Sequence, residues 1–363
     1  MKKMDKNNNS NDCVSILEEL NAEFVDLYLP VMIYLLFSLI LGLLGNSFLT
    51  YIHFCKFDET ATKVFIIGLF VCDFLTCLIC IPMEFFILCF SFTFHSSFAC
   101  RLIRFFVAIA MFNSSIILFL LGIERYIVMC RPFKYNNISV VTSKKILASS
   151  TISSAILNIP VLEVYNTQNR LVRQCGNIGK VCSFPDSLDD TVFPFVYYCV
   201  VLCGYLYLLI FLMIFYLLIE LRIKKIQRSM RSNRQRSSVS FGTPSKIPSF
   251  NDKNEGNVSE TKLYPVSILK KHSVQLSKIN VSLLPTTLLW AICYLLHFIA
   301  IFWRMFEHNF NDTESDRKQI LYKLLIYSFY LKCAVNPYLY GTFNRQFYSE
   351  LQRLFQKAFQ LYK

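Results

Sequence analysis

The sequence predicts an all-α protein: a bundle of seven transmembrane helices followed by a short amphipathic eighth helix. Of the 363 residues, 54% are apolar and only 17% are charged, whereas a soluble domain carries about 25% charged residues. Seven stretches reach the roughly 20 apolar residues that an α-helix needs to cross a bilayer. Positive charge gathers in alternate links between these stretches, as in multi-pass membrane proteins.

The seven apolar stretches follow one another along the chain. They are Leu29–His53, Lys63–Phe90, Cys100–Cys130, Ile146–Tyr165, Thr191–Leu221, Ile279–Phe306 and Ile320–Tyr340. The fourth is the weakest, because serine and threonine dilute it between Ser149 and Ser154. It still counts as a span, since without it the basic link before it and the link after it would lie on the same side of the membrane.

The distribution of lysine and arginine predicts the orientation of the chain. The link Arg222–Lys278 has 13 basic and 3 acidic residues, so it carries most of the net charge of +13. The links after the first and third spans are also basic, whereas acidic residues gather in the N-terminal tail and before the seventh span. We therefore expect the N-terminus outside and the C-terminus in the cytosol. The basic balance does not indicate a nucleic-acid partner.

Three parts follow from this topology. Residues 1–28 form an extracellular tail, residues 29–341 form the membrane domain, and residues 342–363 form a cytoplasmic amphipathic helix and tail. Within the membrane domain, the loop 222–278 is polar, Ser-rich and basic, so its middle is expected to be disordered and its ends to extend the flanking helices. In the tail, an apolar residue recurs every four positions, which is typical of a helix lying on membrane lipids. These residues are Phe347, Leu351, Phe355 and Phe359.

Two glycosylation sequons fall on the expected outer face. They begin at Asn8 and Asn311, and both asparagines are predicted acceptors.

Four short motifs occur in order, each at a matching depth in a different span. Helix one contains Gly45-Asn46, helix two contains Leu69 and Asp73, helix three ends with Glu124-Arg125-Tyr126, and helix seven ends with Asn336-Pro337-x-x-Tyr340. With this set the chain resembles the rhodopsin-like G-protein-coupled receptors, from helix one into the tail. The resemblance implies a heterotrimeric G protein as the cytoplasmic partner.

The resemblance also assigns residues to G-protein coupling and activation. These are Glu124, Arg125, Tyr126, Phe133, Tyr216, Asn336, Pro337 and Tyr340. Glu124 is expected to hold Arg125 at rest, and Pro337 to permit a hinge because it removes a backbone hydrogen bond. Phe133 is either the apolar contact to the G-protein α subunit or an ordinary interfacial aromatic residue.

The expected surroundings of the Asp73 carboxylate, at mid-membrane depth, differ from the family pattern. In relatives, the residues matching Asp73, Ser114 and Asn336 help to bind a sodium ion. Here Lys332 lies one helical turn above Asn336. We hypothesise that its ammonium replaces the sodium ion. The alternative is that Lys332 extends outward or toward lipid.

Helix six departs from the family as well. Leu296 stands where a proline is usual, and the acidic residue that would latch Arg125 is missing. Pro285 offers an alternative bend. We therefore expect a resting state held mainly by Glu124, with raised basal signalling.

The outer third of the bundle points to a peptide ligand. Val107 stands where amine receptors have an aspartate, and Tyr330 where opsins have the retinal lysine, so both ligand classes are set aside. The expected pocket mixes charged and aromatic side chains. It comprises Glu84, Arg104, Val107, Tyr294, His297, Arg304, Tyr327 and Tyr330. Taken singly, each charged residue could equally be an interfacial anchor.

The outer loop Asn166–Asp190 has two short extended runs punctuated by glycine and asparagine, a hairpin pattern. In peptide receptors such a hairpin is tied to the top of helix three. The resemblance favours a Cys100–Cys182 disulfide, with Cys175 as the alternative partner.

The sequence thus predicts a plasma-membrane receptor, not an enzyme, that binds an extracellular ligand, most simply a neuropeptide, and activates a G protein. No cofactor or metal is expected. The rival interpretations are a scaffold that does not couple to G proteins and a transporter using Asp73 and Lys332 as relay charges.

Overall fold

The computed structural model describes residues 6–130, 139–172, 177–183, 192–239, 266–307 and 316–343, with the single positions 349, 352, 353 and 356. Several predicted features lie outside these residues, so their predictions stand untested. They are the G-protein contact Phe133, the sequon asparagine Asn311, the alternative cysteine Cys175, the middle of the basic loop at 240–265, and most of the eighth helix.

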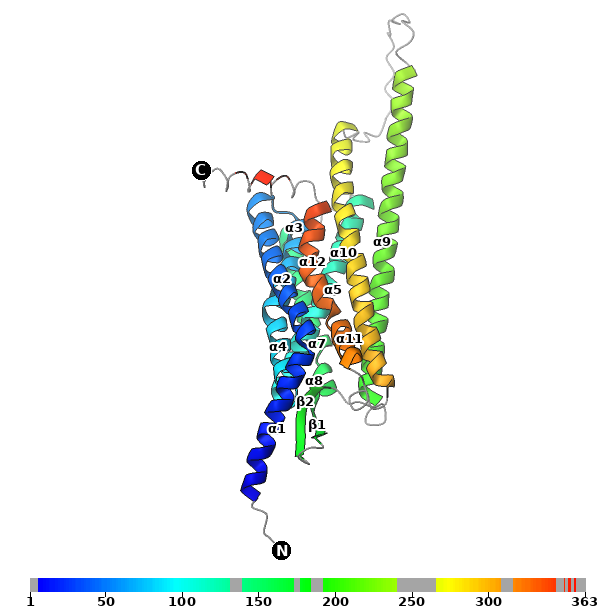
Figure 1. The fold of residues 1–363 in the computed structure, drawn as a ribbon. Helices are drawn as coiled ribbons and strands as arrows, with labels where there is room; N and C mark the ends of the chain where they lie inside the picture. The colour runs from blue at the N-terminus through cyan, green and yellow to red at the C-terminus, as the bar shows by residue number, and fades with distance from the viewer. Residues whose placement is uncertain are drawn as a thin grey trace, which may run out of the picture.

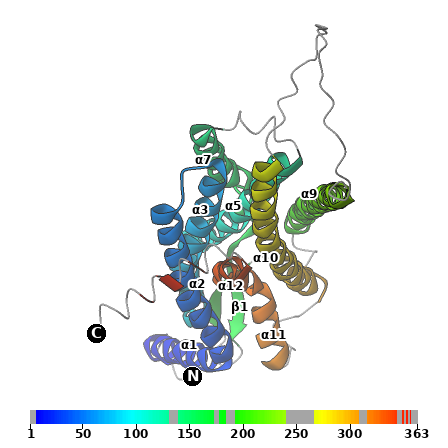
Figure 2. The ribbon, with the colours of Figure 1, turned by 90° about the horizontal axis from the view of Figure 1, so that it is seen from above.

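The described chain is an all-α bundle, which confirms the predicted fold class (Figures 1 and 2). The helices that form its spans are α2 (Leu29–Lys56), α3 (Ala61–Leu75) with η1 (Thr76–Cys80) and α4 (Ile81–Cys89), α5 (Ser97–Cys130), α7 (Val140–Leu157) with α8 (Val161–Val164), α9 (Val192–Val239), α10 (Val266–Phe306), and α11 (Asp316–Ile326) with α12 (Ser328–Phe343). Among the described residues, six spans are long and apolar enough to cross a membrane. The seventh is divided between α11 and α12.

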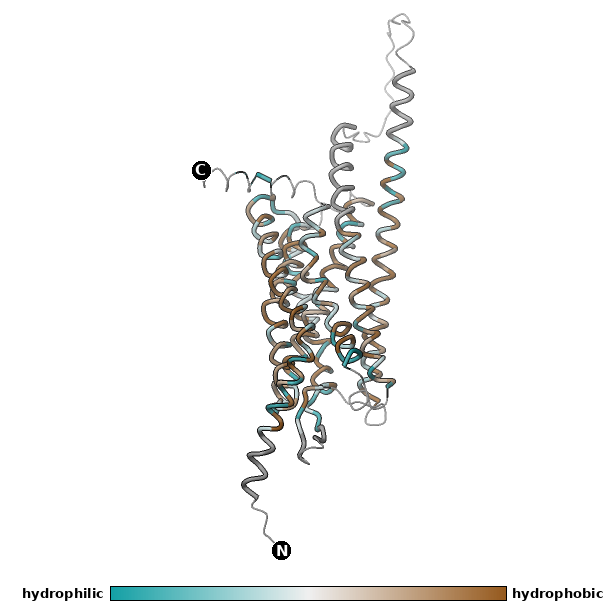
Figure 3. Tube along the Cα trace, in the orientation of Figure 1, coloured by the Kyte–Doolittle hydropathy of each residue, from teal (hydrophilic) through white to brown (hydrophobic). Residues whose placement is uncertain are grey.

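The outer surface of the bundle is apolar, as a lipid environment requires. Apolar residues cover the middle of the bundle, and polar residues gather toward its ends (Figure 3). Large apolar side chains such as Leu44, Phe54 and Ile152 are mostly exposed. The weakest predicted span, the fourth, is among the six.

The two ends of the bundle carry different structures. The N-terminal helix α1 (Lys6–Leu27), a β-hairpin and α11 lie at one end, while α9 and α10 extend past the bundle at the other (Figure 1). These extensions run to Val239 and from Val266, so the ends of the basic loop continue helices five and six, as expected. The helical form of the N-terminal tail was not predicted.

Helix one approaches helix seven closely at the Gly45-Asn46 motif. A Cβ atom at Gly45 would lie 2.6 Å from the Pro337 ring, so only glycine fits there. Asn46 Nδ2 donates to the carbonyl of Cys333 at 3.0 Å. This motif therefore fixes α2 against α12.

The second span contains a π-helical turn, η1, directly before Pro82. Proline has no N–H group, and its ring clashes with the carbonyl four residues earlier in an α-helix. A wider turn relieves this clash. The turn separates Asp73 in the inner part of the span from Glu84 in the outer part.

The seventh span breaks at Tyr327. The Ile326 carbonyl is paired with the His297 ring at 2.6 Å, and the Tyr327 carbonyl accepts from Tyr34 at 3.0 Å. Side chains of neighbouring helices thus satisfy backbone groups that a continuous helix would use, as buried backbone in a membrane requires.

The predicted hairpin is present. Strands β1 (Asn166–Val172) and β2 (Asn177–Ser183) pair antiparallel, with Asn166 opposite Ser183. Lys180 also pairs through its backbone with Phe92 and Phe94, which joins the hairpin to the loop after α4. Asn21 of α1 binds the same loop, at Phe92 N and Thr93 Oγ1. The helix α1, the loop after α4 and the hairpin are therefore joined at one end of the bundle, which is named the outer end after the orientation predicted from the sequence.

Candidate functional site

Three helices place a buried ion pair at the middle of the bundle. Lys332 Nζ of α12 lies 2.7 Å from Asp73 Oδ1 of α3, and both side chains are fully buried. Ser114 of α5 donates to the same oxygen at 3.0 Å and also contacts the ammonium. Asn336 Nδ2 donates to Asp73 Oδ2 at 2.7 Å. Donors of this chain therefore occupy both oxygens of Asp73. Of the two alternatives for Lys332, the structure has the inward one.

At the opposite end of the bundle, named the inner end after the predicted orientation, the arginine of the Glu124-Arg125-Tyr126 motif is buried against its neighbouring glutamate. Arg125 is 1% exposed, and its Nε lies 3.2 Å from Glu124 Oε2. Thr62 of α3 donates to the other oxygen of Glu124. Arg125 is thus held toward Glu124, and Glu124 is held by a neighbouring helix.

The tyrosines expected at this end pack against neighbouring helices. The Tyr216 hydroxyl of α9 lies 2.8 Å from Thr287 Oγ1 of α10. Tyr340 is buried with its ring 5.4 Å from those of Phe70 and His53. The Tyr126 ring stacks on Phe215 at 5.4 Å. The link between Tyr216 and Thr287 was not predicted, and it restrains helix six where the sequence lacks the usual acidic latch.

The outer half of the bundle contains an aromatic cavity of about 100 Å³. Six of the eight residues expected in the pocket line it. These are Glu84, Arg104, Val107, Tyr294, His297 and Tyr327. At its base, Trp290 Nε1 donates to Ser115 Oγ at 2.9 Å, and the Tyr294 hydroxyl donates to the Met111 carbonyl at 2.8 Å. The base is therefore held by hydrogen bonds between α5 and α10.

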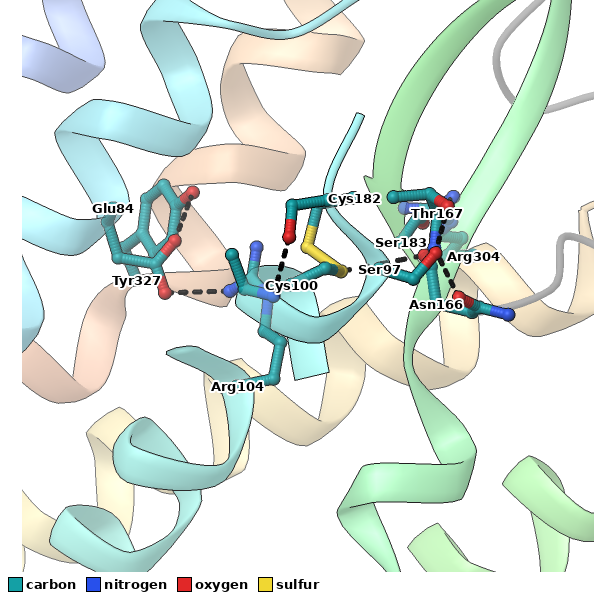
Figure 4. The surroundings of a disulfide bond; sticks show 12 residues. Glu84, Ser97, Cys100, Arg104, Asn166, Thr167, Cys182, Ser183, Arg304 and Tyr327 are labelled. Carbon is teal, nitrogen blue, oxygen red and sulfur yellow. Dashed lines mark hydrogen bonds and ion pairs between the residues drawn. A yellow bond between two sulfur atoms is a disulfide. The ribbon is translucent and has the colours of Figure 1, made fainter. Parts of the chain in front are cut away.

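Two expected pocket residues lie elsewhere. Tyr330 is fully buried, with its ring 4.0 Å from that of Phe329, and it does not line the cavity. Arg304 lies at the outer rim, where it donates to Ser183 Oγ at 2.7 Å (Figure 4). Arg304 thereby ties α10 to the hairpin.

Sequence reasoning missed most of the aromatic wall. Besides Trp290, the unpredicted lining includes Tyr165, Tyr197, Tyr198 and Tyr205. In α9 a signal was available, because Tyr198, Val201, Tyr205 and Leu208 recur every three or four residues and so share one helical face. All four line the cavity.

The charged residues of the cavity form a short chain of contacts. Arg104 Nη1 lies 2.7 Å from Glu84 Oε1, and the Tyr327 hydroxyl donates to Glu84 Oε2 at 3.0 Å (Figure 4). Glu84 is fully buried. These contacts connect α5, α4 and the break between α11 and α12.

A disulfide joins Cys100 at the top of α5 to Cys182 in β2, with a Cα–Cα distance of 5.4 Å. This is the pairing that the resemblance favoured. Beside it, the hydroxyl groups of Ser97 and Thr167 lie 2.6 Å apart (Figure 4). The hairpin is therefore held above the cavity by one covalent bond and several polar contacts.

Breaking this disulfide is expected to destabilise the protein. Cys182→Ser should lower the free energy of unfolding by about 2–4 kcal/mol, since the bond closes a long loop. The measurement is thermal unfolding of the purified chain in lipid nanodiscs without reductant. Cys203→Ser is the matched control, because Cys203 is a free, exposed cysteine. Equal loss in both variants would contradict the prediction.

Comparisons with known proteins agree with this architecture. The family model described as 7 transmembrane receptor (rhodopsin family) matches residues 45–340, most of the chain. Human G-protein coupled receptor 39 is 28% identical over 183 residues, which is 47% of this chain and 40% of that protein. The RYamide receptor of Tribolium castaneum is 28% identical over 137 residues, which is 36% of this chain and 37% of that protein.

The aligned stretches span about two fifths of each relative. The family match instead runs from the Gly45 motif in helix one to Tyr340 in helix seven. It therefore includes all four motifs and the Cys100–Cys182 disulfide. This chain belongs to the rhodopsin family of seven-transmembrane receptors.

Proposed function

We propose that this receptor binds an extracellular peptide in the aromatic cavity and activates a heterotrimeric G protein at the inner ends of α5, α9 and α10. One observation carries the proposal: the helix that lines the cavity through Arg104 also holds the buried Arg125–Glu124 pair at its other end. A ligand that shifts α5 or its contacts can therefore bias an element at the cytoplasmic end. As a member of a receptor family, the chain is not an enzyme.

The proposed orientation places the N-terminus, the hairpin and the cavity outside the plasma membrane. The exposed part of α9 beyond the bundle is basic, at Arg222, Lys224 and Lys225, which favours the cytosol and contact with anionic lipid. Asn8 and Asn311 would then be available for glycosylation, and Phe133 would lie on the G-protein side.

The names of the relatives support a peptide as the ligand. One relative is called a receptor for an RYamide, and the other a G-protein coupled receptor. The cavity is compatible with this class, because it combines aromatic walls with a few charged groups.

A reconstitution experiment tests the proposal. The purified chain in nanodiscs is exposed to pools of synthetic peptides, and guanine-nucleotide exchange is measured on a panel of purified G proteins. Peptide-evoked exchange is the expected result. Peptide uptake into sealed vesicles without exchange would favour a transporter, and binding without exchange would favour a scaffold.

The restraint between α9 and α10 predicts a change in basal activity. Thr287→Val removes the hydrogen bond to Tyr216 and should raise ligand-independent exchange about fivefold, because a hydrogen bond contributes about 1 kcal/mol to the closed state. The matched control is Thr50→Val, since the Thr50 hydroxyl has no hydrogen-bond partner among the residues that the structure describes. Unchanged basal exchange in Thr287→Val would show that this link does not hold the resting state.

A further inference from the structure

Both oxygens of the carboxylate in the cavity already accept a hydrogen bond from the protein. Glu84 Oε1 is paired with Arg104, and Glu84 Oε2 accepts from Tyr327. The side chain is fully buried between these two partners. A cationic ligand group would have to displace Arg104 from Glu84 and would leave that guanidinium without its counter-charge, which is costly in a buried site.

Arg104, the other member of this pair, has N–H groups that donate no hydrogen bond to the residues that the structure describes. A guanidinium has five N–H donors, and among the described residues Arg104 uses one of them, in its bond to Glu84. Its Nε atom is buried without a hydrogen-bond partner. Its guanidinium lies 5.4 Å from the centre of the Tyr165 ring, at the cavity wall. An arginine fork with open donors is suited to a planar acceptor such as a carboxylate.

Lys323, which does not itself line the cavity, lies against the ring of the lining residue Tyr327. Lys323 Nζ lies 6.0 Å from the centre of the Tyr327 ring and 5.4 Å from that of Tyr28. None of the ion pairs found in the described part of the chain involves Lys323. Tyr327 thus contacts Lys323 through its ring and Glu84 through its hydroxyl group.

The size of the cavity limits what can enter. A volume of about 100 Å³ is well below the roughly 300–1,000 Å³ of a site that takes a whole small ligand. Its walls are mostly tyrosine and other large apolar side chains. It therefore has room for about one side chain of the ligand and the group next to it.

We propose that the cavity receives the C-terminal residue of the ligand as a free carboxylate on an aromatic or large apolar amino acid. Arg104 takes the carboxylate with its open donors, Lys323 supplies a second positive charge, and the aromatic wall takes the side chain. This inference rests on the proposed function, because it names the end of the peptide that enters the receptor.

Matched peptide pools test the inference by binding alone. Two pools of random tetrapeptides ending in Phe, Tyr, Trp or Leu are made, one with a free C-terminal carboxylate and one with a C-terminal amide. The shift in the thermal unfolding midpoint of the purified full chain in nanodiscs is measured with each pool. The acid pool should reach half of its maximal shift at a concentration at least about tenfold lower, as expected for hydrogen bonds to a charged group.

Two variants locate the effect. Lys323→Met keeps the Glu84–Arg104 pair. It should lower the ratio of the half-maximal concentrations of the amide and acid pools by about tenfold. Arg104→Lys keeps a cation beside Glu84 but loses the fork, and should also weaken binding of the acid pool. The matched control is Lys318→Met, an exposed lysine on the same helix, whose side chain is 52% exposed.

Two results would overturn the inference: an amide pool that shifts the midpoint at equal or lower concentration, or a Lys323→Met variant with an undiminished acid preference. Failure of the proposed function gives a different result, namely acid-selective binding without nucleotide exchange.

Discussion

Replacing Lys332 with methionine is expected to lower the free energy of unfolding by about 3–5 kcal/mol, because breaking one partner of a buried ion pair leaves the other charge uncompensated. Asp73 would keep its hydrogen bonds from Ser114 and Asn336 but lose its only counter-ion among the described residues. The measurement is thermal unfolding of the purified chain in nanodiscs.

The double variant Asp73→Asn with Lys332→Met removes both charges and should recover most of this loss. Lys144→Met is the matched control, since Lys144 lies 3.8 Å from Glu59 with both side chains more than half exposed. Exposed pairs contribute about 0–1 kcal/mol. If Lys332→Met and Lys144→Met were equally stable, the buried pair would have no special role.

The same pair predicts the response to sodium. We propose that the ammonium of Lys332 occupies the place where relatives bind a sodium ion. The unfolding midpoint of the natural protein should then be the same in sodium and in potassium at equal ionic strength. Lys332→Met should acquire a sodium-dependent midpoint, because Asp73 is then free to accept a cation. A sodium dependence of the natural protein would contradict the proposal.

Replacing Arg125 with alanine is expected to lower peptide-evoked nucleotide exchange by at least about tenfold. Arg125 is the one charged group of its motif able to donate to a G protein once Glu124 releases it, and hydrogen bonds to charged groups contribute about 1.5–3 kcal/mol each. Exchange should therefore fall by at least about tenfold, while peptide binding at the outer cavity remains. The measurement pairs exchange with the peptide-induced unfolding shift.

Because Arg125→Ala leaves Glu124 buried without its partner, a second variant separates coupling from folding. Glu124→Gln keeps the bond from Thr62 but frees Arg125, and should raise basal exchange. Arg222→Ala, at an exposed position on α9, controls for loss of positive charge at this end. Unchanged exchange in Arg125→Ala would favour the scaffold.

Most of the fold was predictable because membrane spans are long, apolar and separated by charged links. The hairpin and its Cys182 bond were also predictable, since turn residues and the family pattern agree there. The Asp73–Lys332 pair was one of two alternatives: helical geometry puts Lys332 one turn above Asn336, and only the resemblance put Asn336 beside Asp73.

What the sequence did not predict depends on contacts between distant segments. The bond from Trp290 to Ser115 joins residues 175 positions apart, and no local pattern reports it. The helical N-terminal tail is held through Asn21 by a loop more than 70 residues away. Tyr330 was placed in the pocket from its depth, but depth does not give the direction in which a side chain points near the break at Tyr327.

The π turn before Pro82 has a consequence for the alignment of this receptor with its relatives. An i→i+5 turn holds one residue more than an α-helical turn, so it acts as a one-residue insertion inside a span. Each residue of an α-helix advances by about 100°. In a relative that lacks the π turn, the part of the second span beyond this point would therefore turn a different helix face toward the bundle. A gapless sequence alignment would then pair Glu84 with a residue one position away from the one that occupies the same place in space.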